Sequence, residues 1–505
     1  MSHLAYHPPD DPVDLETDYV VVGSGAGGAT AAVALARGGA RVALVEAGAW
    51  RDPEHYPSTA YGAMRDLFDD WGTTITRGRA MWPVVQASTV GGTTVINCAI
   101  CVRTPGDIFA QWQREHGVGG DAMAEAVWKH QDVLEQELCA EVVPDAAAGR
   151  SNRLAMQGAM AMGYDSHAMT RYAKGCVGSG QCLQGCRSLR KQSTNLNFIP
   201  EVLTRGGDVL SSARVKRILF DGGNGRRATG VTGWFRHPAT RAKGAKFVVR
   251  ARKAVLVAAS ATHSPALLQR SGVRSPALGK FFRAHPGTGL FGCYDDPVDM
   301  NIGATQGWAS TAFRVDPGLK LETLAVPPEM VAGRLSGGGQ ELMDRIREYR
   351  HLAMWVHAVR AESVGTVENG FGDRPVVRYT LDRADMERFR KGMAVVARTH
   401  FAAGARAVIP GVYGLPYKIG PDQVGLLEEG PLDPRAYIAI LSHLFGGCVI
   451  GSDPARSVCD GQGRVHGYEG LLVVDASAIP TNLGVNPQHT IMALARLWAE
   501  QLLDP

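Results

Sequence analysis

Residues 18–47 restrict the fold of this chain more than any other stretch, and they read DYVVVGSGAGGATAAVALARGGARVALVEA. The apolar run at 19–22 is typical of a buried parallel strand. Three glycines with the spacing G-x-G-x-x-G follow it and open an alanine-rich helix: Gly23, Gly25 and Gly28. A second apolar strand, 41–45, ends on Glu46. The pattern predicts a strand–helix–strand unit of a parallel sheet.

This unit has the parts that a dinucleotide site requires. The glycine turn lets the backbone approach a pyrophosphate, and the helix N-terminus favours its negative charge. The carboxylate of Glu46 can accept hydrogen bonds from ribose hydroxyls. Glycine-rich turns also serve ordinary tight connections, but here both strands, the helix and the acid occur together. We therefore predict dinucleotide binding.

Length and composition limit the remaining possibilities. A chain of 505 residues is too long for one ordinary core, so two domains are expected. Hydrophobic residues make up 45% and charged residues 20%, which is typical of a globular protein. The net charge of +4, from 53 basic and 49 acidic side chains, is too small to indicate nucleic-acid binding.

The ends and the cysteines favour a cytoplasmic location. The first residues, MSHLAYHPPDDPVDLE, are polar and proline-rich and do not resemble a signal peptide. No uninterrupted apolar run has the length of a membrane span. Nine cysteines, an odd number in a large chain, do not indicate a secreted disulfide framework.

A second glycine-rich stretch, 86–105, reads QASTVGGTTVINCAICVRTP. Its glycines bring backbone amides close to a ligand, and short polar side chains follow them; the residues concerned are Gly91, Gly92, Thr93, Thr94 and Asn97. The simpler interpretation is a glycine turn before a strand at 95–102. The other is a second wall for the same dinucleotide.

Three cysteines lie close together in the stretch 175–194: Cys176, Cys182 and Cys186. The C-x-x-C pairs of a structural zinc site are missing, and no histidine occurs within the stretch. Cys98 and Cys101 could complete a ligand set only if the fold brought them near. We expect packed thiols and no metal.

The remaining chain divides into a middle part and a returning end. Strands are expected at 213–220, 230–234 and 246–249, and a buried strand at 253–259 leads into a turn and an amphipathic helix. Alternating strands at 352–360 and 376–381 surround a helix at 384–403, which we assign to a substrate-side domain. After residue 441 a buried strand ends on Asp475, and a loop leads to a terminal helix. The cofactor-binding part is therefore expected to use both ends of the chain.

Four stretches resemble the glucose-methanol-choline (GMC) oxidoreductases, a family of FAD-dependent alcohol oxidases and dehydrogenases. They are GSGAGG with Glu46, VGGTTVINCAICVRTP, ATHSPALLQRSGV, and SHLFGGCVIG followed by VVDASAIPTNLGVNPQHTIMALA. They occur in the family's order. GGTTVINCAICVRTP, together with CLQGCRSLRKQST from the stretch 175–194, most resembles long-chain alcohol oxidases and bacterial relatives. The resemblance implies a Rossmann-like α/β FAD-binding domain and a second α+β domain built on an antiparallel sheet.

The expected domains follow this resemblance. The FAD-binding domain would comprise residues 1–284, with inserted cap segments at about 110–175, and would be completed by 436–505. Residues 285–435 would bind the substrate. Besides the glycines, Glu46, Thr93 and Asn97, we expect cofactor contacts at Ala26, Val215, Ala259, Asp475, Ala476 and Pro487.

The family's catalytic pair falls on His443 and Asn486. Oxidation of an alcohol removes the hydroxyl proton while hydride leaves carbon for flavin N5, and an imidazole can take that proton near neutral pH. The Asn486 amide can orient the oxygen but cannot act as a base. His489 is expected in the terminal helix with a structural role, as are His263 and His285 elsewhere.

Departures from the family pattern affect cofactor and substrate. Ile96 stands where some members attach FAD through a histidine, so non-covalent FAD is expected. Gly446, Gly447 and Cys448 resemble bacterial sterol oxidases, which leaves a sterol substrate open beside an apolar or aromatic alcohol, or a sugar.

Other functions on the same scaffold stay open. A binding module without redox chemistry, a flavin lyase and a photoenzyme are alternatives, since a fold does not fix a reaction. The electron acceptor could be oxygen, a quinone or another protein. No nucleic acid or membrane span is expected.

Overall fold

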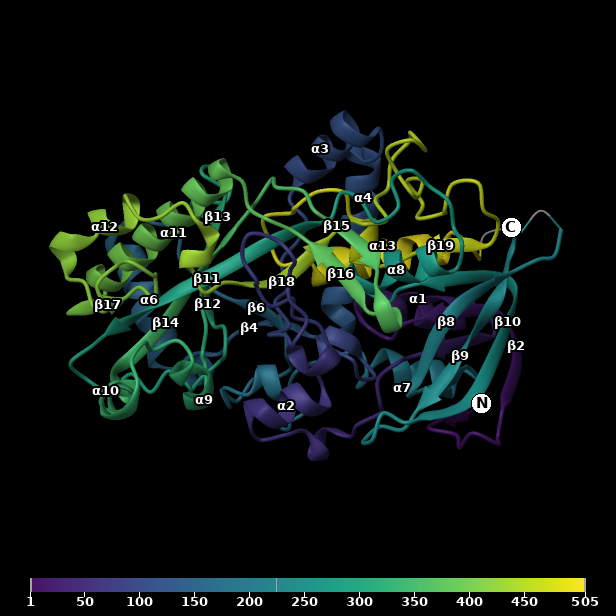
Figure 1. The fold of residues 1–505 in the computed structure, drawn as a ribbon, viewed down its shortest axis with the longest axis horizontal. Coiled ribbons are helices and arrows are strands. Elements are labelled where there is room, and N and C mark those ends of the chain that lie inside the picture. Colours follow the sequence, from purple (N-terminus) through teal and green to yellow (C-terminus); the bar gives the residue numbers. More distant parts are fainter. Residues whose placement is uncertain (1, 224, 504–505) are drawn as a thin grey trace.

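Two β-sheets of different character lie side by side along the longest axis of the molecule, the first at the right of Figure 1 and the second at the left. The computed structural model describes residues 2–223 and 225–503. Within these residues, no helix combines the length and apolar composition that crossing a membrane requires.

The first sheet has the strand order β1-β7-β3-β2-β10-β9-β8, and β19 also pairs with β10. Strands β1, β7, β3, β2, β10 and β19 pair in parallel, whereas β9 and β8 continue the sheet antiparallel. The bounds are β1 Ser2–Leu4, β2 Val13–Val22, β3 Val42–Val45, β7 Asp208–Leu210, β8 Ala213–Phe220, β9 Ala228–Arg236, β10 Lys243–Val257 and β19 Leu471–Val473. The expected Rossmann-like sheet is confirmed.

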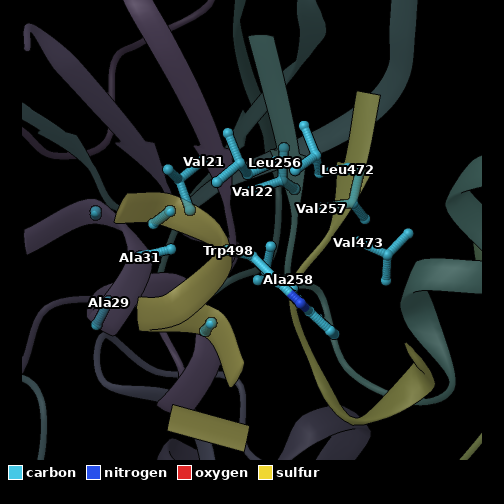
Figure 2. Packing of buried hydrophobic residues seen from close by; sticks show 14 of the residues in the cluster. Val21, Val22, Ala29, Ala31, Leu256, Val257, Ala258, Leu472, Val473 and Trp498 are labelled. Atoms are coloured by element: carbon cyan, nitrogen blue, oxygen red, sulfur yellow. The ribbon is translucent and has the colours of Figure 1, made fainter. Parts of the chain in front are cut away.

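Small residues let helix α1 (Ala26–Arg37) lie directly on this sheet. A Cβ at Gly27 would come 1.9 Å from the Val474 carbonyl oxygen, and one at Gly28 would come 1.9 Å from the Gly23 carbonyl oxygen. The terminal helix α13 (Gln488–Glu500) belongs to the same core. Figure 2 shows this packing for Val21, Val22, Leu256, Val257, Leu472, Val473, Ala29, Ala31 and Trp498.

The second sheet is antiparallel throughout, with the order β17-β11-β14-β13-β12-β5 and β18 paired to β11. The bounds are β5 His167–Ala168, β11 Arg283–Cys293, β12 Trp308–Ser310, β13 Leu319–Thr323, β14 Leu352–Val359, β17 Ala407–Ile409 and β18 Ile440–Phe445. Two small ribbons accompany the sheets: β4 Ala140–Val142 with β6 Thr170–Tyr172, and β15 Thr366–Asn369 with β16 Pro375–Arg378. The expected antiparallel sheet is confirmed, and the domain limits of 284 and 435 stay a prediction.

Helices surround both sheets (Figure 1). Besides α1 and α13 they are α2 Ala60–Asp66, α3 Gly106–His116, α4 Gly120–Glu137, α5 Asp145–Ala148, α6 Arg150–Ala161, α7 Phe198–Thr204, α8 His263–Arg270, α9 Pro328–Ala332, α10 Gly339–Arg347, α11 Arg383–Ala402 and α12 Gly425–Glu428. The expected helices at 122–137 and 384–403 correspond to α4 and α11.

The expected strand at 95–102 is wrong. A short 3-10 turn, Gly92–Thr94, leads instead into irregular backbone. Ala99 has a φ of +55°, in the left-handed region that a strand does not use. The segment therefore winds along the cavity described below and contributes only an isolated bridge at Ile100.

Candidate active site

A cavity of about 600 Å³ is lined by residues of both sheets. One half is bounded by the glycine turn after β2, the end of β3 and the start of α8. The other half is bounded by β11, β13, β14 and β18 of the second sheet. Cofactor and substrate chemistry can therefore meet where the two sheets face the same space.

The glycine turn after β2 is built by contacts that leave no room for side chains. Gly23 has a φ of +101°, and a Cβ there would lie 2.2 Å from the Ala258 carbonyl oxygen. A Cβ at Gly92 would lie 2.7 Å from the Cα of Gly25. Two backbone segments far apart in sequence thus meet beside the N-terminus of α1, as a site for a pyrophosphate requires.

Glu46 holds this turn together from the end of β3. Its Oε2 accepts hydrogen bonds from the backbone N (2.9 Å) and Oγ (2.8 Å) of Ser24, and its Oε1 accepts from the Gly48 N at 2.7 Å. Burial raises the pKa of this carboxyl, and the three donors act in the opposite direction. Glu46 also lines the cavity, and its contact with a ribose stays a prediction.

Most of the expected cofactor residues are brought together in the cavity wall. Those that line it are Gly23, Gly25, Ala26, Glu46, Gly92, Thr93, Asn97, Val215, Ala259, Asp475, Ala476 and Pro487. Gly28 and Gly91 lie behind the wall: Gly28 packs on Gly23, and a Cβ at Gly91 would lie 2.8 Å from a Val95 methyl group.

One buried donor of this half has no partner in the protein. Arg270 lines the cavity and donates to the carbonyls of Lys216 and Val215, but its Nη1 is buried without a hydrogen-bond partner among the described residues. Buried donors normally have a hydrogen-bond partner, so this one is available to a polar ligand in the cavity. The donor set therefore fits a dinucleotide cofactor with its acceptor-rich adenosine diphosphate half.

His443 lies in the other half of the cavity, on β18. The register of β18 and β11 places it opposite His285, and the two Nδ1 atoms are 3.1 Å apart. His285, which the sequence suggested was only structural, is thus in direct contact with the candidate base.

Asn486 joins His443 to a buried ion pair. Its Nδ2 lies 3.2 Å from the His443 Nε2, and its Oδ1 accepts a hydrogen bond from the Lys320 ammonium. Lys320 in turn lies 2.7 Å from an Oε1 of Glu322, and both side chains are almost fully buried. The Gln306 amide donates to the other Glu322 oxygen at 2.9 Å.

These contacts fix the proton on His443. An ammonium can only donate, so the Asn486 atom that faces Lys320 is the carbonyl oxygen and the atom that faces His443 is the NH₂ group. The NH₂ group donates to Nε2, which must therefore carry a lone pair. The proton of the neutral ring then lies on Nδ1, where His285 can accept it. His443 is held in the form that a general base needs.

Electrostatics keep this ring neutral. Burial lowers the pKa of His443 to about 4; Glu322 acts to raise it and Lys320 to lower it further. For Glu322, burial alone would raise the pKa of the carboxyl, but Lys320 and His443 bring it below its usual value. The site thus contains an ionised pair beside an unprotonated imidazole at neutral pH.

Sequence reasoning missed Lys320, Glu322 and the role of His285. The available signal is in β13, whose sequence is LKLET: two opposite charges alternate with leucines in a short strand. An alternating pattern places both charges on one face, and the structure buries that face. Charged residues that alternate with apolar ones more commonly form the solvent-exposed face of a strand. The sequence alone therefore does not predict that Lys320 and Glu322 are buried.

Two cysteines of the 175–194 stretch, Cys176 and Cys182, lie beside Arg171, whereas the Cys186 sulfur contacts the Ser188 hydroxyl and the Lys191 backbone N–H. The Arg171 Nη2 donates to the Cys182 sulfur at 3.0 Å, and its Nη1 lies 3.9 Å from the Cys176 sulfur. A hydrogen bond with Cys182, together with burial, raises the pKa of Cys98. All nine cysteines are free thiols. In the part of the chain that the structure describes, none of Cys98, Cys176, Cys182 and Cys186 belongs to a group close enough to share a metal ion, and the absence of a metal stays a prediction.

Cys101 lies elsewhere, within 4.8 Å of ligand atoms of Glu135 and His489. His489 is fully buried in α13, where its Nδ1 contacts the Tyr172 hydroxyl and its Nε2 lies 3.1 Å from a Glu135 oxygen. The terminal helix position expected for His489 is confirmed.

Comparisons with known proteins identify the family of this chain. Two family models, both described as GMC oxidoreductase, match residues 17–287 and 362–495. A GMC-type oxidoreductase of Mycobacterium tuberculosis, itself uncharacterised, is 36% identical over 97% of this chain and 76% of its own length. One from Sinorhizobium fredii is 31% identical over 97% of this chain and 95% of its own. A long-chain-alcohol oxidase of Arabidopsis thaliana is 27% identical over 96% of this chain and 66% of its own.

Solved structures share the fold at low identity. Pyridoxine 4-oxidase from "Mesorbium loti" superposes with a TM-score of 0.73 at 19% identity, covering 96% of this chain and 99% of that one. A formate oxidase variant from Aspergillus oryzae, studied for FAD modification, has a TM-score of 0.72 at 17% identity over 97% and 98%. The chain belongs to the GMC oxidoreductase family, and its cofactor is FAD.

Proposed function

We propose that this oxidoreductase converts an alcohol to a carbonyl compound, with His443 as the base that removes the hydroxyl proton. The observation that carries the proposal is the Asn486 NH₂ group 3.2 Å from the His443 Nε2, because it requires a lone pair on that nitrogen. FAD, when bound, supplies the two-electron acceptor for the hydride that leaves the carbinol carbon.

In this proposal the hydroxyl of the substrate lies between Asn486 and His443 and replaces their direct hydrogen bond. The O–H donates to Nε2, and the Asn486 NH₂ group donates to the oxygen and stabilises its developing negative charge. Lys320 keeps the amide in this orientation and adds positive charge beside it. His285 accepts the proton on Nδ1 and so orients the ring.

We propose that FAD is held without a covalent bond. The cavity wall from Gly23 to Glu46 would bind its adenosine diphosphate half, with Arg270 offering a further donor. Ile96 lines the cavity where some family members have the histidine that attaches FAD, and it offers no nucleophile. Release of the flavin into the supernatant on acid precipitation tests this assignment.

The substrate half of the cavity favours an alcohol with an apolar body. Its wall includes Leu324, Val326, Met330, Met354 and Val356. The similarity to long-chain-alcohol oxidases supports the same class. The electron acceptor is not indicated by any residue of the wall.

A panel of alcohols tests the function. Purified holoprotein is mixed anaerobically with aliphatic, aryl, sterol and sugar alcohols, and the flavin absorbance is followed. Bleaching by an apolar alcohol supports the proposal, and repeating the assay with oxygen and with a dye identifies the acceptor. If no alcohol reduces the flavin, but light or a substrate of another class changes its absorbance, a lyase or photoenzyme is favoured instead.

A further inference from the structure

Arg334 places a positive charge in the wall of the substrate half of the cavity. It follows helix α9, and its Nη2 donates to the Gly289 carbonyl oxygen of β11 at 3.0 Å. The residue is partly buried and lines the cavity. This carbonyl is the only hydrogen-bond partner that the described residues provide for the guanidinium, which leaves most of its N–H donors unused.

No carboxylate among the described residues pairs with Arg334. Arg37, another partly buried arginine, by contrast contacts Glu137 at 2.8 Å and Glu201 at 2.7 Å. Burial lowers the pKa of Arg334 to about 10, with no charged neighbour acting on it, so it stays protonated at neutral pH. A desolvated cation without a counter-ion is costly unless a ligand supplies the opposite charge.

The register of the second sheet fixes where this charge lies relative to the candidate base. His443 is opposite His285, and Gly289 is four residues further along β11. Four residues of antiparallel strand span about 13 Å. The Gly289 carbonyl that Arg334 contacts therefore lies four strand residues away from the His285–His443 pair.

Apolar residues line the wall along and beyond this span. Ala358 lies opposite Gly287, Val356 lies opposite Gly289, and Leu324 and Met354 lie past the Gly289 row, with Val326 also in the wall. Glu322 lies opposite Val356, which in turn lies opposite Gly289. The Glu322 carboxylate already forms an ion pair with Lys320 and accepts a hydrogen bond from Gln306. The cavity wall thus carries an unprotonated base and, four residues along the same sheet, a cation without a carboxylate partner, with apolar side chains near both.

We propose that Arg334 binds a carboxylate at the far end of the substrate, so that the substrate class is an apolar alcohol carrying a terminal carboxylate. A guanidinium presents paired donors that match a carboxylate, and the match is strongest where water is excluded. Since the hydroxyl must reach His443, this assignment rests on the proposed function. In the reaction the hydroxyl oxygen would give its proton to His443 and the carbinol carbon would give a hydride to bound FAD, so that a C=O bond forms and the product is an oxo acid whose carboxylate is unchanged.

The first test compares two substrate series in two variants. Flavin reduction is measured anaerobically with unsubstituted primary alcohols and with ω-hydroxy acids of increasing chain length. Arg334→Met should raise the half-saturating concentration of the hydroxy acids by about tenfold to a hundredfold, which corresponds to the loss of one charged hydrogen bond. The half-saturating concentrations of plain alcohols should not rise. Arg334→Lys should bind the hydroxy acids more tightly than Arg334→Met does. Arg347→Met, on the exposed surface of α10, is the matched control.

The second test needs no turnover and separates this inference from the function. Alkanoates without a hydroxyl are titrated into the holoprotein, and binding is followed by calorimetry and by the flavin spectrum. Tighter binding by the parent protein than by Arg334→Met supports the carboxylate site, even if no alcohol reduces the flavin. Equal binding of alkanoates by both proteins overturns it, even if alcohols are oxidised. If Arg334→Met does not fold, the same comparison is made with Arg334→Lys and Arg334→Gln.

Discussion

The Nδ2 of Asn486 lies 3.2 Å from the Nε2 of His443. The contact joins the last loop of the chain to β18, and its direction is set from outside by the Lys320 ammonium, which can only donate. A lysine with no direct contact to the imidazole thus determines where its lone pair lies. This arrangement leads to predictions about pH, stability and rate.

The rate of flavin reduction should be insensitive to acid until well below neutral pH. Because burial lowers the pKa of His443 to about 4, the ring keeps its lone pair as the pH falls from 7 to 5 and is protonated near 4. The reductive rate constant, measured by anaerobic stopped flow, should therefore be retained above this pKa and lost as the pH falls through it. An acidic limb near the ordinary histidine value of about 6.5 would show that the base is not this buried ring.

Lys320→Met should destabilise the protein strongly. The change leaves the buried Glu322 carboxylate without its cation, a loss of about 3–5 kcal/mol in the free energy of unfolding. Adding Glu322→Gln should recover much of that loss. Urea unfolding of the single and double variants measures both effects.

The matched control removes a lysine from a more exposed pair. Lys418 contacts Glu348 at 2.6 Å, with both side chains about one-third exposed. Lys418→Met should cost about 1 kcal/mol or less. Equal losses at Lys320 and Lys418 would mean that the ion pair beside Asn486 is not buried as described.

His357→Leu should make the protein less sensitive to acid. Both ring nitrogens are buried without a hydrogen-bond partner in the described part of the chain, and burial lowers the pKa of His357 to about 3. Between pH 6.5 and 3 the unfolded chain binds this proton and the folded chain does not, so the free energy of unfolding falls as the pH falls. The slope is about 1.4 kcal/mol per pH unit for one such group, and the variant should lack it. Denaturant unfolding at pH 7, 6 and 5 measures the difference, and parallel curves for parent and variant would refute the assignment.

Glu46→Ala should lose FAD and some stability together. The change removes the acceptor of three hydrogen bonds, and the backbone amides of Ser24 and Gly48 stay buried without partners. Glu46→Gln keeps an acceptor and should retain more flavin. Flavin content after dialysis and thermal unfolding of the apoprotein give the two readouts, with Glu54→Ala as an exposed control. Full flavin occupancy in Glu46→Ala would show that the carboxylate does not bind the cofactor.

How far the sequence predicts this structure depends on whether a signal is local. The first strand–helix–strand unit was predictable because its glycines, its small helix residues and Glu46 lie within one short stretch. The contact of Lys320 with Asn486 joins strand β13 to the last loop, 166 residues further along the chain, and no local pattern in either stretch indicates it. The prediction of a strand at 95–102 is wrong because Ala99 adopts a left-handed φ, which the local sequence does not predict.

His443→Ala tests the central claim most directly, through anaerobic stopped-flow reduction of the flavin by the best alcohol of the panel. The variant should still bind FAD, because His443 lies in the other half of the cavity from Glu46 and the glycine turn. Loss of the base should slow reduction on the order of a hundredfold or more at neutral pH, with partial recovery as the pH is raised. His167→Ala, at an exposed position, should reduce at the parent rate. A His443→Ala flavin that the alcohol reduces as fast as the parent flavin would contradict the account.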